Sequence, residues 1–187
     1  MGVIGDVNKC ITMDCKQAGD LVYLVGETYN EMGGSHYFAT HGYIGNSVPK
    51  VQAEKGKKLM NALSAAMQKG LVAACHDLSE GGIGVAAAEM AFAGGLGMTV
   101  RLKGVPLAET IDRDDFILFS ESNTRFLVEV VPENKDDFEK ALAGAAFAGV
   151  GKVVDDNELV IRGLKGGVIL SADIYELKEA WQKPLRW

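Results

Sequence analysis

Short apolar runs bounded by glycine or polar turns recur along this chain, and they predict β-strands. The clearest are Leu21–Val25 and residues 126–131. Residues 98–102 alternate between polar and apolar side chains, as a half-buried strand does. Shorter strands are expected at residues 153–154, 159–161 and 168–170. The polar residues Asp155, Asp156 and Asn157 predict that the first two of these form a hairpin, with the carboxylates serving the turn rather than a metal.

Helical spacing fills much of the remaining chain. Apolar residues at three- and four-residue intervals, with lysines between them, predict an amphipathic helix over residues 51–69 that ends at Gly70. A second helix is expected over residues 133–148, beginning after Pro132 and ending at the glycines 149 and 151. Further helices are expected at residues 173–182, 35–40 and 107–111. Residues 1–18 are expected to form an edge strand or a lead-in segment. Together these elements predict an α+β fold in one domain, residues 19–187, with a mixed, mostly antiparallel sheet.

Residues 71–102 combine a strand, a glycine turn and a helix. The apolar run 71–75 predicts a buried strand, and His76 and Asp77 come where it ends. A turn is expected at residues 79–82, before a nearly all-apolar segment, residues 83–93. A helix that is apolar all round is buried, so this helix is expected to lie inside the domain.

The start of this buried helix is a candidate anion site. The first backbone N–H groups of a helix have no partner within the helix, and such a place attracts anions. Ser79, Gly81 and Gly82 would present these amides and let a ligand approach the main chain. Asp77 adds a carboxylate, which Mg²⁺ bridges to phosphate oxygens in many sites. The alternative is a helix cap beside a solvated carboxylate.

Two further turns carry candidate ligand contacts. Gly33, Gly34 and Ser35 offer amides and a hydroxyl at the start of a short helix, or else form a cap that permits close packing. The turn Ser120, Glu121 and Ser122, with Arg125, would bind a hydroxylated phosphorylated molecule, or else form a closed salt bridge and turn.

Composition excludes several classes of protein. The net charge of −6 and the sequence pI near 5.1 argue against a nucleic-acid binder, which needs a basic surface. Lys55, Lys57 and Lys58 are expected to form a solvated helix face. Three scattered cysteines fit neither a disulfide framework nor a zinc site, and no stretch is long and apolar enough for a membrane span or a signal peptide. A cytoplasmic location is therefore expected.

Three motifs in one order carry a family resemblance. HDLSEGGIGVAAAEMA, residues 76–91, resembles a signature in the last domain of the phosphoribosylformylglycinamidine (FGAM) synthase family, which is grouped with aminoimidazole ribonucleotide (AIR) synthase among ATP-using enzymes. AGDLVYLVGETYNEMGGSHYF, residues 18–38, resembles the opening of that domain. LFSESNTRFLVEV, residues 118–130, resembles a later strand entry of it. The resemblance extends from Gly19 to about Lys178.

The resemblance implies a layered α/β/α domain like the C-terminal domain of AIR synthase, preceded by a lead-in, residues 1–18, from a missing N-terminal domain. It implies the ATP-dependent amidation of formylglycinamide ribonucleotide in purine biosynthesis, a ligase reaction that this chain would not perform alone. Asp77 would reach Mg²⁺ on a bound ATP or ADP shared with a missing domain, and the eleven other candidate residues above, His76 included, would frame that site. The implied partners are the remaining synthase domains, a glutaminase subunit and a small accessory subunit.

Two alternatives remain open at this stage. The chain is also compatible with a non-catalytic interaction module that docks through the face of the helix over residues 51–69 or through the Gly33 loop. It is also compatible with a part of another ATP-using enzyme of the same superfamily, such as a relative of thiamine-monophosphate kinase.

Overall fold

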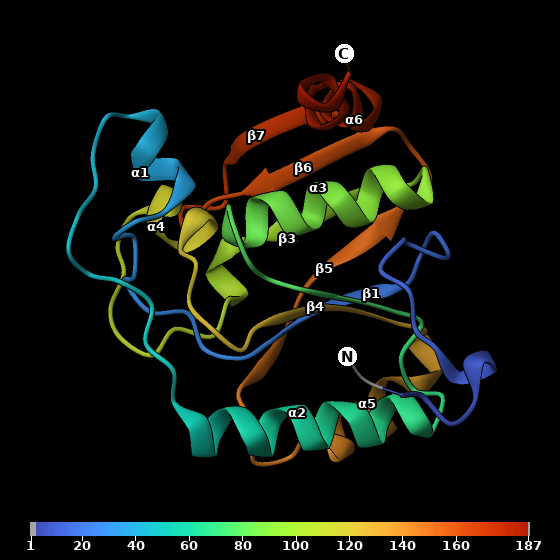
Figure 1. The fold of residues 1–187 in the computed structure, drawn as a ribbon. Coiled ribbons are helices and arrows are strands. Elements are labelled where there is room, and N and C mark those ends of the chain that lie inside the picture. The colour runs from blue at the N-terminus through green and yellow to red at the C-terminus, as the bar shows by residue number, and fades with distance from the viewer. Residues whose placement is uncertain (1–2, 187) are drawn as a thin grey trace.

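Seven strands form one mixed sheet in the order β2–β4–β1–β5–β3–β6–β7 (Figure 1). The computed structural model describes residues 3–186. All neighbouring strands are antiparallel except β3 and β6, which are parallel. The strands are β1 Leu21–Val25, β2 Ala74–Asp77, β3 Gly97–Arg101, β4 Phe126–Val130, β5 Phe147–Val154, β6 Glu158–Arg162 and β7 Val168–Asp173.

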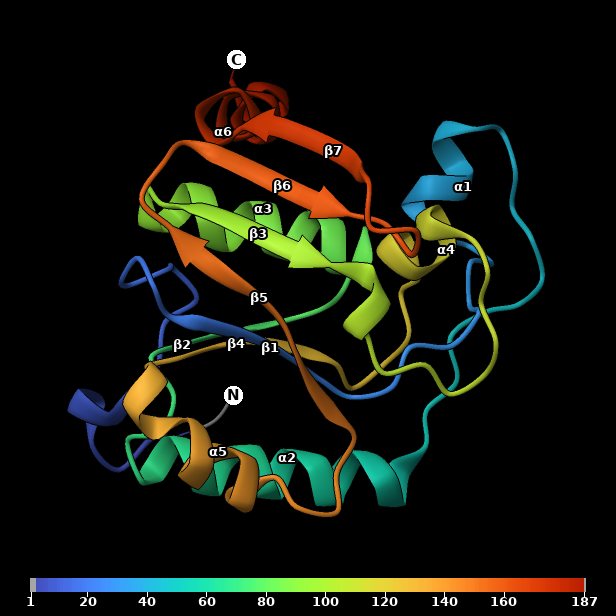
Figure 2. The same cartoon turned by 180° about the vertical axis from the view of Figure 1, so that it is seen from behind.

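Helices cover both faces of this sheet (Figures 1 and 2). α3 packs against α6 and α4 on one face, and α2 packs against α5 on the other. The helices are α1 His36–Thr40, α2 Ala53–Gln68, α3 Gly82–Gly94, α4 Asp114–Phe119, α5 Lys135–Ala141 and α6 Ile174–Gln182. Single 3₁₀ turns lie at Val7–Lys9, Leu102–Gly104, Pro132–Asn134 and Lys183–Leu185. Among residues 3–186, no helix has both the length and the apolar character needed to cross a bilayer.

Alternation along β1 shows how the sequence builds these layers. Successive side chains of a strand point to opposite faces. Val22 and Leu24 are buried in the cluster that contains α3, whereas Tyr23 and Val25 are buried in the cluster formed with α2 and α5. A strand with both faces covered is apolar throughout, and this one is. The α+β fold and the α/β/α layering predicted from the sequence are therefore confirmed.

Several predicted elements agree closely with the structure. The strand Leu21–Val25 has the expected bounds, and the helix expected over residues 51–69 is α2, Ala53–Gln68. The short helix after Gly34 is α1, whose N-cap Ser35 accepts a hydrogen bond from the Phe38 amide at 3.2 Å. The last helix is α6, in which the Asp173 carboxylate accepts from the amides of Tyr175 and Glu176. Each of these elements carries a local cap or periodicity that its own sequence supplies.

The predicted hairpin of residues 153–161 is wrong. β5 and β6 do not pair with each other, because β3 lies between them and pairs with both. The connection through Asp155–Asn157 crosses the start of β3 at Gly97, where an added Cβ would collide with the Asp156 carboxylate. Polar turn residues predict that the chain reverses its direction. They carry no information about whether another strand lies between the two strands that they connect.

The helix predicted over residues 133–148 is too long. α5 ends at Ala141, and β5 begins at Phe147. Gly149 and Gly151, which were expected to end a helix, lie inside β5. A Cβ at Gly151 would collide with the carbonyl of Thr99 on β3, so glycine permits the close approach of these two strands. Alanine-rich sequence favours a helix locally, but pairing in the sheet decides here.

Three smaller differences concern segment ends. Residues 107–111 form no helix, and the helix lies later, at α4. β2 begins at Ala74 rather than residue 71, so that His76 and Asp77 belong to the strand itself. Residues 3–20 contain no strand. Their backbone nevertheless covers the edge of the sheet, because Thr12 accepts a hydrogen bond from the amide of Cys75 at 3.1 Å.

Candidate functional site

The three turns singled out in the sequence meet at one end of the sheet. α1 and α4 lie together there in both views, and the ring of Tyr37 stacks on that of Phe119 at 4.7 Å (Figures 1 and 2). A single carboxylate oxygen of Glu121 accepts hydrogen bonds from the backbone amides of His36, at 3.1 Å, and Gly81, at 2.9 Å. Glu121 is therefore an internal anion at the starts of both α1 and α3, where the sequence indicated attraction for an anion.

The backbone amides of the turn before α1 donate their hydrogen bonds to carbonyls of this same chain. The Gly33 amide donates to the Ser47 carbonyl at 2.8 Å, and the Gly34 amide donates to the Ile44 carbonyl at 2.6 Å. A Cβ at Gly33 would lie 2.7 Å from the Ser47 nitrogen, so the backbone packs closely there. This geometry corresponds to the capping alternative for Gly33, Gly34 and Ser35, whose amides the sequence had suggested were free.

The expected phosphate contact of Arg125 is replaced by an internal one. Arg125 is 1% exposed, and its guanidinium donates to the Ser122 carbonyl and the Thr28 hydroxyl, each at 3.0 Å, and to the Ser120 carbonyl. Burial lowers the pKa of Arg125 to about 10, and the negative charges of two nearby glutamates oppose this shift. The side chain therefore fastens the loop before β4 and presents no exposed surface to a phosphate.

The serines of the same turn are also buried. Ser120 donates its hydroxyl to the Tyr29 carbonyl at 2.7 Å, and the Ser122 hydroxyl accepts from the Tyr29 amide at 3.0 Å. Both side chains are fully buried. Ser120 and Ser122 thus join the loop after β1 to the loop before β4, which corresponds to the alternative of a closed turn.

Asp77, by contrast, is open to solvent. Its side chain is 70% exposed, and the Nδ1 atom of His76 lies 3.6 Å from its carboxylate. The other ring nitrogen of His76 lies 2.7 Å from the Glu89 carboxylate on α3, which also accepts from the Trp181 indole at 2.9 Å. The Glu89 carboxylate therefore holds the His76 ring against α3, while the Asp77 carboxylate remains accessible at the end of β2.

The start of α3 lies close to Asp77 along the chain and has no side-chain cap. Gly81 and Gly82 have φ angles of 74° and 57°, which favour glycine, and a Cβ at Gly82 would collide with the Ser120 carbonyl. The Ser79 hydroxyl donates to Glu80. Within residues 3–186, the first-turn amides of Ile83 and Gly84 have no hydrogen-bond acceptor. These two amides are the donors that remain for an anion.

The residues present fit one coordination position of Mg²⁺. That ion commonly takes one or two protein carboxylates and completes its shell with water and phosphate oxygens. Asp77 supplies one exposed carboxylate. The described part of the chain contains no cluster of three or more His, Cys, Asp or Glu side chains arranged to hold a metal. Any metal here would therefore depend on ligands from outside this chain.

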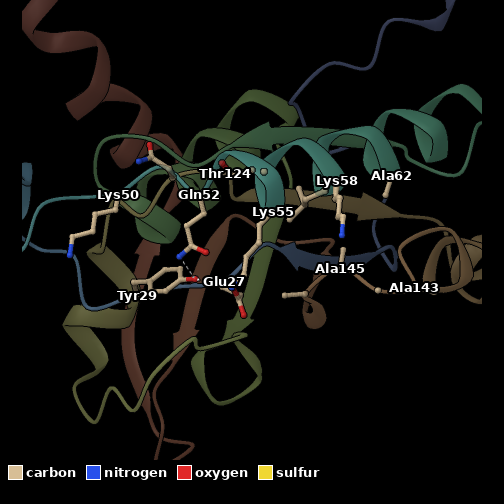
Figure 3. A pocket seen from close by; sticks show the side chains of 15 residues that line it. Glu27, Tyr29, Lys50, Gln52, Lys55, Lys58, Ala62, Thr124, Ala143 and Ala145 are labelled. Atoms are coloured by element: carbon tan, nitrogen blue, oxygen red, sulfur yellow. Dashed lines mark hydrogen bonds and ion pairs between the residues drawn. The ribbon is translucent and has the colours of Figure 1, made fainter.

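A cleft on the other face of the sheet was not predicted from the sequence (Figure 3). It has a volume of about 580 Å³ and lies between α2, the loop after β1 and the loop before β5. Lys55 and Lys58, expected on a solvated helix face, both line it. The only sign of this cleft in the sequence was the cluster of lysines. Their sequence alone could not reveal a cleft, because its other walls come from segments far away in the chain.

Comparison with known proteins places this fold among the α+β domains of AIR synthase and its relatives. Residues 17–163 match the family model described as AIR synthase related protein, C-terminal domain, and the chain belongs to this family. The matched region includes every candidate residue discussed above.

The most informative relatives are PurL proteins. The chain is 38% identical to phosphoribosylformylglycinamidine synthase subunit PurL of Alkaliphilus metalliredigens, over all of this chain and 24% of that protein. Among solved structures it resembles T. maritima PurL complexed with FGAR, with a TM-score of 0.79, 22% identity, and coverage of 91% of this chain and 30% of that one. T. maritima PurL complexed with ATP gives a TM-score of 0.73 and 21% identity over 91% and 27%. The chain thus spans about a quarter of its curated relative.

Proposed function

We propose that this chain acts as one domain of an FGAM synthase, in the ATP-dependent, C–N bond-forming amidation of formylglycinamide ribonucleotide in purine biosynthesis. The observation that carries the proposal is the 38% identity to PurL along the whole chain, with three motifs in one order. Since the chain spans 24% of that relative, the remaining domains of the synthase are its proposed partners, together with a glutaminase subunit and an accessory subunit. Alone it would be inactive.

The proposed role in this enzyme is to frame a Mg²⁺–nucleotide site. Asp77 would contribute one metal ligand, and the amides of Ile83 and Gly84, at the turn formed by Ser79, Gly81 and Gly82, would face a phosphate. Support comes from the exposure of the Asp77 carboxylate beside an uncapped helix start. The T. maritima PurL structures with ATP and ADP make ATP or ADP the proposed nucleotides.

An exchange of one carboxylate tests this role. The chain would be combined with the remaining domains of a matching synthase, and nucleotide retention after gel filtration would be measured for Asp77→Asn. We expect Asp77→Asn to lose Mg²⁺-dependent nucleotide retention. The matched control is Asp155→Asn, which removes an exposed carboxylate from the β5–β6 turn and should change nothing. Equal retention in both variants would remove Asp77 from the proposed site.

A specific surface supports docking to the remaining domains. Four large apolar side chains in the connection between α1 and α2 are strongly exposed, namely Tyr43, Ile44, Val48 and Val51. Such a patch on an isolated domain commonly marks an interface. We propose that the rest of the synthase covers it. Replacement of Ile44 and Val51 by serine should weaken association with those domains but leave the thermal unfolding of this chain unchanged, whereas unaltered association would exclude this connection from the interface.

A further inference from the structure

We propose that the cleft beside α2 binds a small phosphorylated molecule, up to the size of a mononucleotide, at a site separate from Asp77. The cleft has a volume of about 580 Å³, which lies within the usual range for small-molecule sites. Its walls come from five segments: the loop after β1, the approach to α2, α2 itself, the loop before β4 and the loop before β5. Figure 3 shows the side chains of Tyr29, Gln52 and Lys55 turned toward one another, with the amine of Lys58 near Ala145 and the Lys50 side chain extending to the other side.

The charge of the cleft is opposite to that of the whole chain. Lys50, Lys55 and Lys58 line it, and among residues 3–186 Glu27 is the only carboxylate that does so. The chain as a whole has a net charge of −6. Lys50 and Lys58 form no ion pair with any carboxylate of residues 3–186. Two lysine amines that line the cleft are therefore available to an anion.

A hydrogen-bond network holds the floor of the cleft in place. The Gln52 amide donates to the Tyr29 hydroxyl at 2.7 Å, and that hydroxyl donates to the Glu27 carboxylate at 3.0 Å. Lys55 pairs with the same carboxylate at 3.0 Å, and this contact lowers the pKa of Glu27. Glu27 is thus already neutralised by Lys55. The net positive charge that remains for a ligand is that of Lys50 and Lys58.

The wall next to this network is tightly built. Thr124 has a φ of 58°, a left-handed conformation that is uncommon for a threonine. It lies against Gly56 in the first turns of α2, where an added Cβ would be 3.1 Å from the Thr124 hydroxyl oxygen. The absence of a side chain at Gly56 therefore lets α2 approach the loop before β4. Lys55 and Lys58 lie near the start of this helix, on either side of Gly56.

The end of the cleft that holds Lys58 also suits an organic group. Small apolar residues line it, namely Leu59, Ala62, Ala143, Ala145 and Ala146. In Figure 3, Ala145 and Ala143 lie near Lys58, whereas Lys50 lies at the opposite end. A ligand that fits this lining combines an anionic group, for Lys50 or Lys58, with an apolar or planar body for the alanines. Inorganic phosphate alone would fill only part of the volume.

Titration of the 187-residue chain tests the proposal directly. The probes are AMP and inorganic phosphate, each with a chelator present so that no metal site contributes, and the readout is the dissociation constant from calorimetry. We expect AMP to bind more tightly than phosphate. The double variant Lys50→Gln/Lys58→Gln should bind AMP at least about tenfold more weakly, since it removes both free positive charges of the cleft.

Matched variants separate the cleft from general electrostatics. Lys57→Gln/Lys69→Gln removes the same charge from exposed positions outside the cleft lining and should keep AMP affinity within about twofold. Ala145→Trp keeps every charge but fills the apolar end, and should abolish AMP binding while leaving the unfolding temperature close to that of the parent. Equal losses in both lysine doubles, unchanged binding by Ala145→Trp, or no AMP binding by the parent chain would overturn the proposal. Asp77→Asn should bind AMP as the parent chain does. The AMP titration therefore tests the cleft alone, and a failure of the proposed Mg²⁺–nucleotide site at Asp77 would not affect it.

Discussion

The carboxylate of Glu121 lies 2.9 Å from the backbone nitrogen of Gly81, and the same oxygen receives the amide of His36. One side chain therefore joins the starts of two helices that are far apart in the sequence. Hydrogen bonds to an ionised group are among the stronger ones in proteins, and a donor that loses its acceptor costs free energy.

Replacement of Glu121 should destabilise the domain. Glu121→Ala leaves two helix-start amides without their acceptor, and we expect a loss of about 2 kcal/mol in the free energy of unfolding. Glu121→Gln, which keeps one acceptor oxygen, should lose about half as much. Chemical denaturation measures both. Added inorganic phosphate should partly restore Glu121→Ala, because it can replace the missing anion, and it should have no such effect on the exposed control Glu80→Gln.

Arg125 should act on stability and not on ligand affinity. Arg125→Met removes three buried hydrogen bonds and leaves the Thr28 hydroxyl and the Ser120 and Ser122 carbonyls without this donor. We expect a loss of about 3 kcal/mol or more in unfolding free energy, measured by urea denaturation. Arg125→Lys should recover only part of it, because a single amine cannot reproduce the planar set of donors. A fully stable Arg125→Met would contradict the internal role.

A buried pair of acids should make stability depend on pH. Asp20 and Glu129 are almost fully buried, and neither oxygen of Asp20 has a hydrogen-bond partner within residues 3–186. Glu129 accepts from the amides of Lys16 and Gln17, while the Lys16 amine pairs with Asp14 at 2.6 Å. Burial raises the pKa of Glu129 to about 7 and also raises that of Asp20.

The sign follows from the raised pKa. A carboxyl with a higher pKa in the folded state contributes stability that is fully present below its unfolded pKa and is lost as the pH rises through the folded value. We therefore expect the unfolding free energy to fall by about 3 kcal/mol between pH 4.5 and pH 8 because of Glu129. Glu129→Gln should flatten this part of the profile. Parallel profiles for the variant and the parent would show that the pair does not titrate as proposed.

Two glycines of β5 offer a direct test of the sheet assignment. Gly151→Ala places a Cβ against the Thr99 backbone, and we expect a loss of at least about 2 kcal/mol in unfolding free energy. Gly149→Ala is the matched control, since its Cβ would meet the Tyr23 ring at an ordinary 3.7 Å. Were residues 147–151 the end of a helix, alanine would be well tolerated at both positions. Thermal unfolding of the two variants distinguishes these cases.

The sequence determined the local elements and the family motifs of this protein. The apolar run Leu21–Val25, the cap residues Ser35 and Asp173, and the spacing of residues 51–69 each specify their own backbone through neighbours in the chain. The same is true of the glycine turn before α3, where Gly81 and Gly82 adopt positive φ angles. The α+β class followed from the order of these elements, because it requires no knowledge of which strand pairs with which.

Only the tertiary structure decided which strands pair and which partners the polar side chains bind. The insertion of β3 between β5 and β6 brings together segments about 50 residues apart, and no turn residue encodes it. The Arg125 guanidinium and the Glu121 carboxylate had the chemistry of ligand contacts in the sequence. In the structure Arg125 bonds to its own turn and to the distant Thr28, and Glu121 bonds to the distant amides of His36 and Gly81. A polar side chain is satisfied by whatever group the fold places within hydrogen-bond distance, and that distance depends on the packing of the whole chain.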